Sequence, residues 1–318
     1  MLETVKNETA NPTWSYKDRA NTVAISVGKS LGFKKAVAVT TGNHGCSAAA
    51  YCAAAGLSSV ILCHEDISCA LVDLIYLFGG TAVVGGNREA FLAALVQQGD
   101  WFPAVTIAPH PQICSPYGVE GFKTIAYEIF EQMGNHTPDD VCIPVGSGDG
   151  CYGIWKGFRE LQVLGVTQKL PRIYACQAEG SNPLVQSFRQ HRTDVVTVPN
   201  AYTSALSIRE SSSSPLALKA IYESGGEAVD CSEAEIEETR MTIGRLGLSV
   251  EGASATSVAC CRKLAASGRI KADESVVCIL TGAGIKWPEL LSPQPRRQPI
   301  SGREIPDGAS LLRTLKAE

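Results

Sequence analysis

The sequence lacks any apolar stretch long enough to span a bilayer, and no apolar run follows a basic region near its N-terminus. Basic residues are not in excess: 28 Lys and Arg stand against 32 Asp and Glu, for a net charge of −4. Such a balance offers no basic surface for nucleic acid and no polybasic membrane anchor. We therefore expect no signal peptide, no membrane or nucleic-acid partner, and a cytoplasmic location.

The cysteine pattern excludes two further classes of protein. The chain has 12 cysteines but no CxxC pair and no Cys/His spacing of the zinc type. Most lie within apolar runs, as small core residues do, and we expect reduced thiols and no metal site. These are Cys46, Cys52, Cys63, Cys69, Cys142, Cys176, Cys260, Cys261 and Cys278.

Short β-branched runs alternate with longer helical patterns, and no internal repeat is present. Several strands read as continuous apolar runs, which is typical of parallel strands buried on both faces. The alternation predicts an α/β fold, and 318 residues suggest about two domains. Predicted strands are Ala36–Thr41, Ser59–Cys63, Thr81–Val84, Ala104–Ala108, Val141–Val145, Arg172–Gln177, Val195–Val198 and Ser275–Thr281. Predicted helices are Asp18–Leu31, Asn43–Ala55, Cys69–Phe78, Arg88–Gln98, Val119–Met133, Gly150–Leu164, Glu233–Leu246 and Ala253–Ala266.

Three stretches have the composition of a chemical site, and the first is Asn11–Arg19. A turn signal leads into Lys17, from which the pattern becomes helical. The positive end of a helix dipole disfavours an ammonium and favours a neutral amine, the form that a Schiff-base lysine needs. Taken alone, a lysine in this position is more often an exposed residue in an ordinary turn.

The second stretch is Thr40–Ser47, where glycines separate a strand from a small-residue helix. Gly42 and Gly45 permit close backbone approach, and free amides at a helix start suit a carboxylate. Asn43 is also compatible with a plain N-cap, and His44 with a partly buried polar residue.

The third stretch, Val145–Gly150, is again strand, glycine turn and helix. Successive amides in such a turn form a nest for a phosphate dianion. Cys151 stands where a dinucleotide fingerprint needs its last glycine, and the Lys-Ser/Thr ending of a P-loop is missing. Asp149 is an awkward neighbour for phosphate and suits a helix cap.

Together the three stretches resemble the fold-type-II pyridoxal phosphate (PLP) enzymes, and most of all the threonine synthase family. The family motif NPTGSFKDR corresponds to Asn11–Arg19, SSGNTG or SSGNHG to Thr40–Gly45, and VGNGGN to Val145–Gly150. The family's TGHGLKDP corresponds to Thr281–Pro288. Further similar segments are Pro116–Thr124, Gln177–Gly180 and Glu251–Ala255.

The resemblance implies PLP as cofactor and assigns a role to each motif. Lys17 would be the Schiff-base residue and the general base at the substrate α-carbon. Asn43 would bind the phenolic oxygen of the cofactor, and Thr281 would face its pyridine nitrogen. Phosphate binding would fall to Gly146, Ser147, Gly148, Asp149 and Gly150, and substrate binding to Thr41, Gly42, His44 and Gly45.

The chain departs from the family pattern at positions that bear on the substrate. Trp14 replaces a glycine beside the lysine, Gly118 an arginine suited to clamp a phosphate, and Phe122 a glutamine. His44 is more like the amino-acid dehydratases. Family members also have a further segment before the lysine motif. These differences leave open a threonine synthase-like lyase or synthase, a serine/threonine-type ammonia-lyase, and a non-catalytic relative that binds PLP or an amino acid.

The resemblance also implies an architecture like that of the tryptophan synthase β-subunit. We expect open parallel sheets with helices on both faces, a small domain at residues 22–108, and a large domain at residues 1–21 and 109–318. PLP would lie between them at strand C-terminal ends. The expected partners are a small amino-acid substrate and a second copy of the chain in a homodimer.

Overall fold

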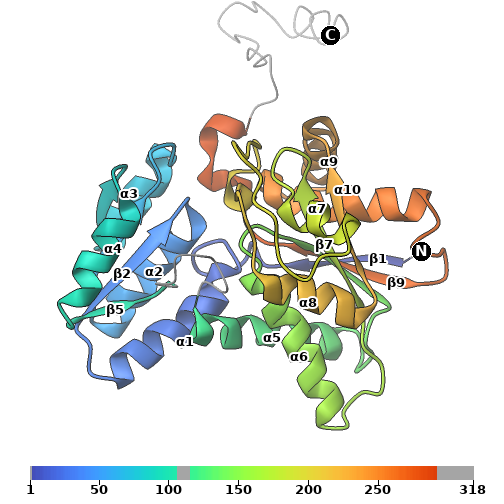
Figure 1. Cartoon of the computed structure of the whole chain (residues 1–318), viewed down its shortest axis with the longest axis horizontal. Coiled ribbons are helices and arrows are strands. Elements are labelled where there is room, and N and C mark those ends of the chain that lie inside the picture. Colours follow the sequence, from blue (N-terminus) through green and yellow to red (C-terminus); the bar gives the residue numbers. More distant parts are fainter. Residues whose placement is uncertain (1, 106–114, 292–318) are drawn as a thin grey trace, which may run out of the picture.

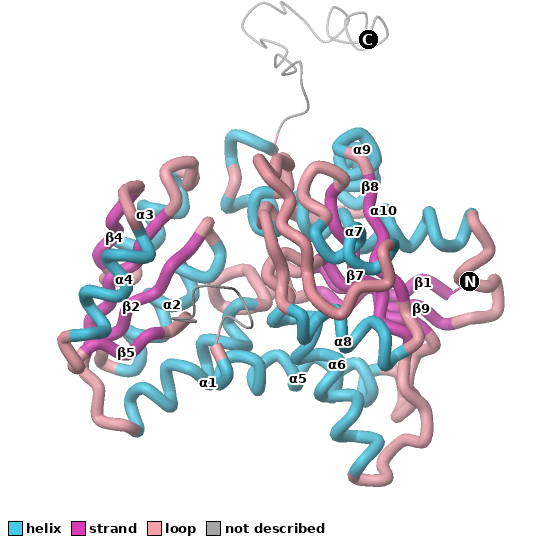
Figure 2. Tube along the Cα trace, in the orientation of Figure 1, coloured by secondary structure: helices cyan, strands magenta, loops and turns pink. Residues whose placement is uncertain are grey.

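The computed structural model describes residues 2–105 and 115–291, and its strands form two parallel sheets (Figure 1). Strand order is β1-β9-β6-β7-β8 in the larger sheet and β4-β3-β2-β5 in the smaller one. Figure 2 shows the two groups of strands apart in space, with helix α1 below and between them. The predicted parallel α/β fold with helices on both faces is confirmed.

The five-stranded sheet is buried on both faces. Its strands are β1 (Leu2–Asn7), β9 (Ser275–Leu280), β6 (Asp140–Pro144), β7 (Arg172–Ala178) and β8 (Glu227–Cys231). Helices α5 (Pro116–Gln132), α6 (Asp149–Val163) and α8 (Pro215–Ser224) contribute to the core on one face, and α9 (Glu233–Arg245) and α10 (Gly252–Ala266) to the core on the other. The short helix α7 is Pro183–Arg189.

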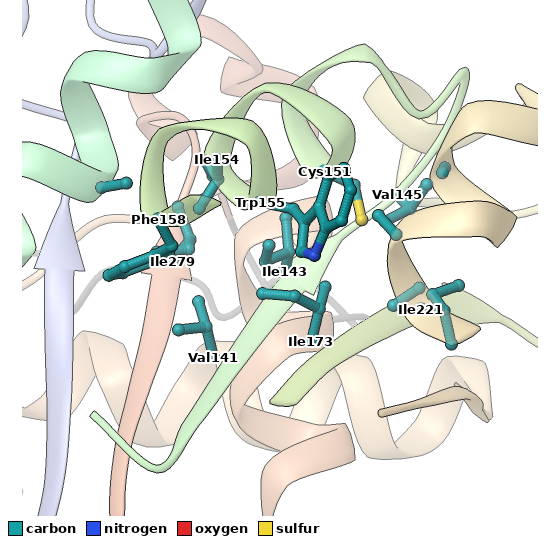
Figure 3. Packing of buried hydrophobic residues seen from close by; sticks show 14 of the residues in the cluster. Val141, Ile143, Val145, Cys151, Ile154, Trp155, Phe158, Ile173, Ile221 and Ile279 are labelled. Carbon is teal, nitrogen blue, oxygen red and sulfur yellow. The ribbon is translucent and has the colours of Figure 1, made fainter. Parts of the chain in front are cut away.

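Alternate residues of β6 show why both faces are apolar. Val141 and Ile143 point to the α6 side, where they pack with Ile154 and Phe158 (Figure 3). Cys142 points to the opposite side and packs against α10. The period-2 geometry of a strand therefore demands an apolar residue at every position, which explains the unbroken apolar runs in the sequence.

The four-stranded sheet is smaller and is also covered on both faces. Its strands are β2 (Lys35–Thr40), β3 (Ser58–Cys63), β4 (Thr81–Val84) and β5 (Trp101–Pro103). Helices α1 (Lys17–Ser30), α2 (Asn43–Ala55) and α3 (Cys69–Leu77) pack on one face. Helix α4 (Arg88–Gln97) inserts Leu92 against Val37 and Leu62 on the other.

Several predicted elements differ from the structure. Residues 195–198 form no strand, and the strand beside β7 is instead β8. The predicted strand Ala104–Ala108 is wrong over Ala104 and Val105, because β5 ends at Pro103; its remaining residues lie outside the described part. β1, α7 and α8 were not predicted. The proposed domain boundary after residue 108 also lies outside the described residues and stays a prediction.

The described cysteines are all unpaired, as the sequence predicts, and all but the exposed Cys69 are buried. Cys142, Cys261 and Cys278 bring their sulfurs within 4.8 Å of one another between β6, β9 and α10. Thiol–thiol contacts and burial hold the pKa of Cys142 and Cys278 well above the ordinary value, whereas the contacts with these two thiols lower the pKa of Cys261. Among the described helices, none has the length and apolarity needed to cross a bilayer.

Helices α1 and α5 approach so closely that their contact requires a glycine. A Cβ built on Gly121 of α5 would lie 1.9 Å from the carbonyl oxygen of Arg19 on α1. This contact matters for function because α1 begins at Lys17 and α5 runs along the larger sheet.

We predict that Gly121→Ala lowers the free energy of unfolding by about 1–3 kcal/mol, because backbone atoms cannot yield to the added methyl group. Gly244→Ala in α9 is the matched control: nothing lies within 4 Å of its added Cβ, and alanine should stabilise that helix by about 0.5–1 kcal/mol. Urea unfolding of both variants measures the difference. Equal stability of the two variants would contradict the close approach.

Candidate active site

Lys17 begins helix α1 at the end of a turn that is held by two sets of hydrogen bonds. Asp18 accepts hydrogen bonds from Thr13 N (2.7 Å) and Thr13 Oγ1 (2.5 Å) and from Ser47 Oγ of α2 (2.6 Å). Tyr16 N donates to the carbonyl oxygen of Thr281 at 2.8 Å, just after β9. The turn is therefore tied to both sheets, and it fixes where the Lys17 side chain starts.

Trp14 adopts a conformation that glycine would adopt more easily. Its φ is +59°, in the left-handed region, and Ala283 N donates to its carbonyl oxygen at 2.9 Å. The side chain is 39% exposed. A bulky ring in a left-handed turn costs on the order of 1 kcal/mol, and here it occurs three residues from Lys17.

The Lys17 amine lies at the glycine turn between β6 and α6. Its Nζ is 3.2 Å from Oδ2 of Asp149, and the two side chains are only 14% and 5% exposed. Burial alone would raise the pKa of Asp149, but Lys17 and a hydrogen bond from Ser147 Oγ (2.7 Å) outweigh burial and lower it. The helix-dipole argument from the sequence did not include this carboxylate, which lies next to the amine.

The glycine turn has the shape of an anion nest. Gly148 is the N-cap of α6 with φ +103°, and a Cβ on Gly150 would lie 2.7 Å from the Tyr16 ring. Serines of the segment before α8 fix the turn from behind: Ser213 Oγ donates to Gly146 O (2.5 Å) and Ser214 N to Ser147 O (2.7 Å). The carbonyl oxygens of Gly146 and Ser147 therefore point toward these serines. The first-turn amides of α6 have no acceptor within the helix. Asp149 is the first helical residue, not the cap.

In the loop before α2, two of the amides expected to bind a substrate already have an acceptor. Gly42 N and Gly45 N donate to Oγ1 of Thr40 at 2.8 and 3.0 Å. Gly42 is the N-cap, so Asn43 is the first helical residue and the plain capping interpretation of Asn43 is wrong. A carboxylate at this loop would compete with the Thr40 hydroxyl.

Two side chains of this loop have buried atoms with no hydrogen-bond partner among the described residues. They are Oδ1 of Asn43 and Nε2 of His44. Burial and the nearby Lys17 lower the pKa of His44 to about 4, so its imidazole is neutral at physiological pH. Its Nδ1 lies 3.4 Å from Nδ2 of Asn21. Unsatisfied buried polar atoms are costly, and at a cleft they indicate a place for a ligand.

Glu251 joins residues that the sequence assigned to separate motifs. Its Oε2 accepts from Asn43 Nδ2 at 2.8 Å and from Trp287 Nε1 at 3.2 Å, and its Oε1 accepts from Thr281 Oγ1 at 3.3 Å. Oγ of Ser254 also lies 3.3 Å from Thr281 Oγ1. Sequence reasoning gave Glu251 no role, although the surrounding segment was similar to the family. The structure thus brings the motifs at Asn43 and Thr281 to one carboxylate.

A cavity of about 260 Å³ borders Glu251. Its lining includes Glu251, Trp287, Leu206 and Arg240, but not Lys17 or the glycine turn. It therefore adjoins the group of site residues without containing the lysine.

Residues 3–282 match the family model described as pyridoxal-phosphate dependent enzyme. Similar proteins include the threonine synthases of Methanocaldococcus jannaschii and Methanosarcina acetivorans. Each is 37% identical over 295 residues, which cover 90% of this chain and 71% of that protein. The chain belongs to the pyridoxal-phosphate-dependent enzyme family. It is a PLP-dependent lyase of the threonine synthase type, as the sequence motifs indicated.

Solved structures agree at the level of the fold. An L-serine ammonia-lyase from Rhizomucor miehei gives a TM-score of 0.74 at 19% identity and covers 88% of both chains. The processed threonine deaminase isoform 2 of Solanum lycopersicum gives 0.75 at 19% identity, covering 91% of this chain and 81% of that one. At these identities the likeness concerns the fold alone.

The residues present fit the cofactor that the family implies. A lysine amine stands beside a glycine nest, and two buried polar atoms in the first turn of α2 have no hydrogen-bond partner in the part of the chain that the structure describes. Thr281 offers a neutral hydroxyl that donates to Glu251, the same carboxylate that binds Asn43. Acidic side chains are unusual at a phosphate site, and those of Asp149 and Glu210 both approach this nest.

We predict that Glu251→Gln weakens PLP binding roughly tenfold, because the new amide cannot accept hydrogen bonds from Asn43, Trp287 and Thr281 together, a loss of about 1–2 kcal/mol. Fluorescence titration with PLP measures the effect. Glu238→Gln, an exposed substitution on α9, is the control and should bind as the wild type does. Unchanged affinity in Glu251→Gln would show that this carboxylate does not orient the site.

Proposed function

We propose that this chain holds PLP covalently on Lys17 and catalyses elimination, or elimination followed by replacement, on the side chain of an amino acid. The observation that supports this most directly is the position of the Lys17 amine, 3.2 Å from Asp149 at the glycine nest. A lysine-bound PLP needs its amine and its phosphate site within one small molecule's reach. When bound, PLP supplies an electron sink for the α-carbon.

In this proposal the chain's own residues transfer the proton and bind the cofactor phosphate. Lys17 bonds to the cofactor and, once released, moves the proton at the substrate α-carbon. Gly146, Ser147, Gly148, Asp149 and Gly150 form the phosphate cup, which presents backbone amides at the start of α6.

Asn43 and Thr281 orient the cofactor ring. One N–H of the Asn43 amide is used by Glu251, and the second N–H would donate to the cofactor's phenolic oxygen. Thr281 is a neutral hydroxyl, which cannot keep the ring nitrogen protonated as a carboxylate would, and this favours elimination chemistry. Both assignments rest on the contacts through Glu251.

The loop of Thr41, Gly42, His44 and Gly45 binds the substrate carboxylate. The Gly42 and Gly45 amides already donate to Thr40 Oγ1, so the substrate carboxylate must compete with that hydroxyl for them. His44, neutral and with a buried Nε2, is able to exchange a hydrogen bond with the substrate without adding charge.

We further propose the assembly that the family resemblance suggests. Residues 22–108 form the small domain and residues 1–21 with 109–318 the large one, with the site between them. The chain works as a homodimer in the cytoplasm on a small amino acid. The separate four-stranded and five-stranded sheets support the two-domain division.

A second candidate function is deamination of serine or threonine. Position 118 favours it: Gly118 stands where threonine synthases have an arginine, and its Cβ would lie 3.3 Å from Ala20, one turn beyond Lys17 on α1. The cofactor lysine therefore lacks the neighbouring guanidinium that would clamp a substrate phosphate. His44 in the α2 loop points the same way.

We expect Lys17→Ala to abolish the covalent PLP adduct that borohydride reduction traps. Peptide mapping of the reduced wild type should locate the pyridoxyl group on Lys17. Lys219→Ala, which removes an exposed lysine on α8, should label like the wild type. A pyridoxyl group on a different lysine of the wild type would refute the assignment.

We expect no phosphate release from saturating O-phosphohomoserine, because Gly118 supplies no cation for its phosphate. Serine, threonine or O-acetylserine should instead be consumed at a rate that disappears in Lys17→Ala. A phosphate assay and a keto-acid assay run on the same preparation separate these outcomes. Rapid phosphate release would assign the chain to threonine synthesis itself, and absence of any Lys17-dependent turnover would contradict the proposed role of Lys17.

A further inference from the structure

Two carboxyl groups border the nest that is proposed to receive the cofactor phosphate. Asp149 starts α6 and pairs with Lys17. Glu210 approaches from the segment before α8: a Cβ on Gly146 would lie 3.2 Å from Cγ of Glu210 and 3.1 Å from Cα of Ile208. The mechanism above gives Glu210 no role.

The backbone around Glu210 is held in place, so the side chain cannot leave by a small shift of the loop. Glu210 N donates to Ser181 Oγ at 2.9 Å, and Ser181 Oγ donates to the Glu210 carbonyl oxygen at 2.9 Å. Ser213 Oγ, three residues later, is bonded to Gly146 O. The same segment thus forms the back of the nest and positions Glu210 beside it.

The charges around the two acids differ in a way that separates their roles. Asp149 has a direct cationic partner in Lys17, which lowers its pKa despite burial. Among the described residues, Glu210 has no cation at ion-pair distance: burial raises its pKa to about 7, Lys17 opposes the rise, Asp149 adds to it, and Arg88 and Arg209 oppose it. The other titratable group at this end of the site, His44, is neutral. Glu210 is therefore the acid that accepts a proton first.

A bound phosphate group would also affect the two acids differently. A phosphate monoester has a charge of about −1.5 to −2 at neutral pH and offers only acceptor oxygens. An ionised Glu210 would repel it, whereas a protonated carboxyl has an O–H to donate. Asp149 keeps a hydrogen bond from Ser147 Oγ at 2.7 Å, which favours its ionised form when Lys17 is bonded to the cofactor.

We propose that Glu210 is a proton-bearing positioning residue of the phosphate nest: it is neutral in the cofactor-bound protein and donates a hydrogen bond to a phosphate oxygen. This inference rests on the proposed function, since it assumes that the nest receives the PLP phosphate. It makes cofactor retention dependent on pH through a residue that takes no part in the chemistry.

The sign of the dependence follows from linkage. The bound form has Glu210 protonated, so above the titration of Glu210 in the free protein each binding event must take up a proton. Affinity then falls tenfold for each unit of rising pH, and below the titration this contribution is constant. Lys17 ionisation acts in the opposite direction, because only a neutral amine bonds to PLP, so a variant comparison is needed to isolate Glu210.

The test is equilibrium binding of PLP between pH 6 and 9 to the wild type and to Glu210→Gln, followed by tryptophan fluorescence. Glutamine is neutral at every pH and can donate to phosphate, and Lys17 is present in both proteins. We expect the ratio of the wild-type Kd to the Glu210→Gln Kd to be flat below about pH 7 and to rise about tenfold per pH unit above it. Glu179→Gln, which changes an exposed residue, should follow the wild type.

Pyridoxal, which lacks the phosphate, is the second arm. Its Kd ratio between the same two proteins should be independent of pH. A PLP ratio that stays constant over the range overturns the inference while leaving the proposed function intact, whereas no PLP binding by the wild type at any pH overturns both. If Glu210→Gln does not fold, as thermal unfolding would show, the wild-type ratio of PLP Kd to pyridoxal Kd decides: it must rise above about pH 7.

Discussion

The ion pair between Lys17 and Asp149 joins the starts of two helices that belong to different parts of the chain. Helix α1 packs on the smaller sheet and α6 on the larger one. Both partners are almost excluded from water, and their attraction offsets part of the cost of burying two charges. Because the pair sits at the glycine nest, the position of the reactive amine and the shape of the phosphate site are set by one contact. The low pKa of His44 has part of its cause in the same Lys17 charge.

Two other buried carboxylates hold the loops that surround this pair. Asp18 binds the turn before Lys17 to Ser47 of α2, and Glu251 binds Asn43 of α2 to Thr281 after β9. Neither carboxylate has a cationic partner at hydrogen-bond distance in the described part of the chain, and each is satisfied by neutral N–H and O–H donors. A buried carboxylate that is satisfied in this way holds its hydrogen-bond donors in place. If one donor moves away, a carboxylate oxygen loses its hydrogen bond in a buried environment, which is costly.

Local patterns were enough to predict the parallel α/β fold and the turns at which the site residues lie. Glycines at Gly42, Gly45 and Gly146–Gly150 mark strand-to-helix turns, and the apolar runs at β6 and β9 mark buried strands. The sequence patterns mispredicted strands where the β-propensity of a segment and its pairing in the folded sheet differ. Residues 195–198 are β-branched but find no strand partner, whereas Glu227–Cys231 contains two acids and still pairs with β7. Glu251 was missed because its partner Asn43 is 208 positions away, a distance that no local pattern spans. Glu210 was missed for the same reason.

The central claim is that the lysine, the nest and the α2 loop form one site for a lysine-bound cofactor that acts on an amino acid. The most direct measurement is the visible absorption spectrum of the purified protein with PLP, titrated with serine, threonine, O-acetylserine, O-phosphoserine and O-phosphohomoserine. We predict a band of lysine-bound cofactor that Lys17→Ala lacks, and a new band when one of these amino acids is added. A wild-type spectrum identical to that of free PLP, unchanged by every amino acid, would contradict the account.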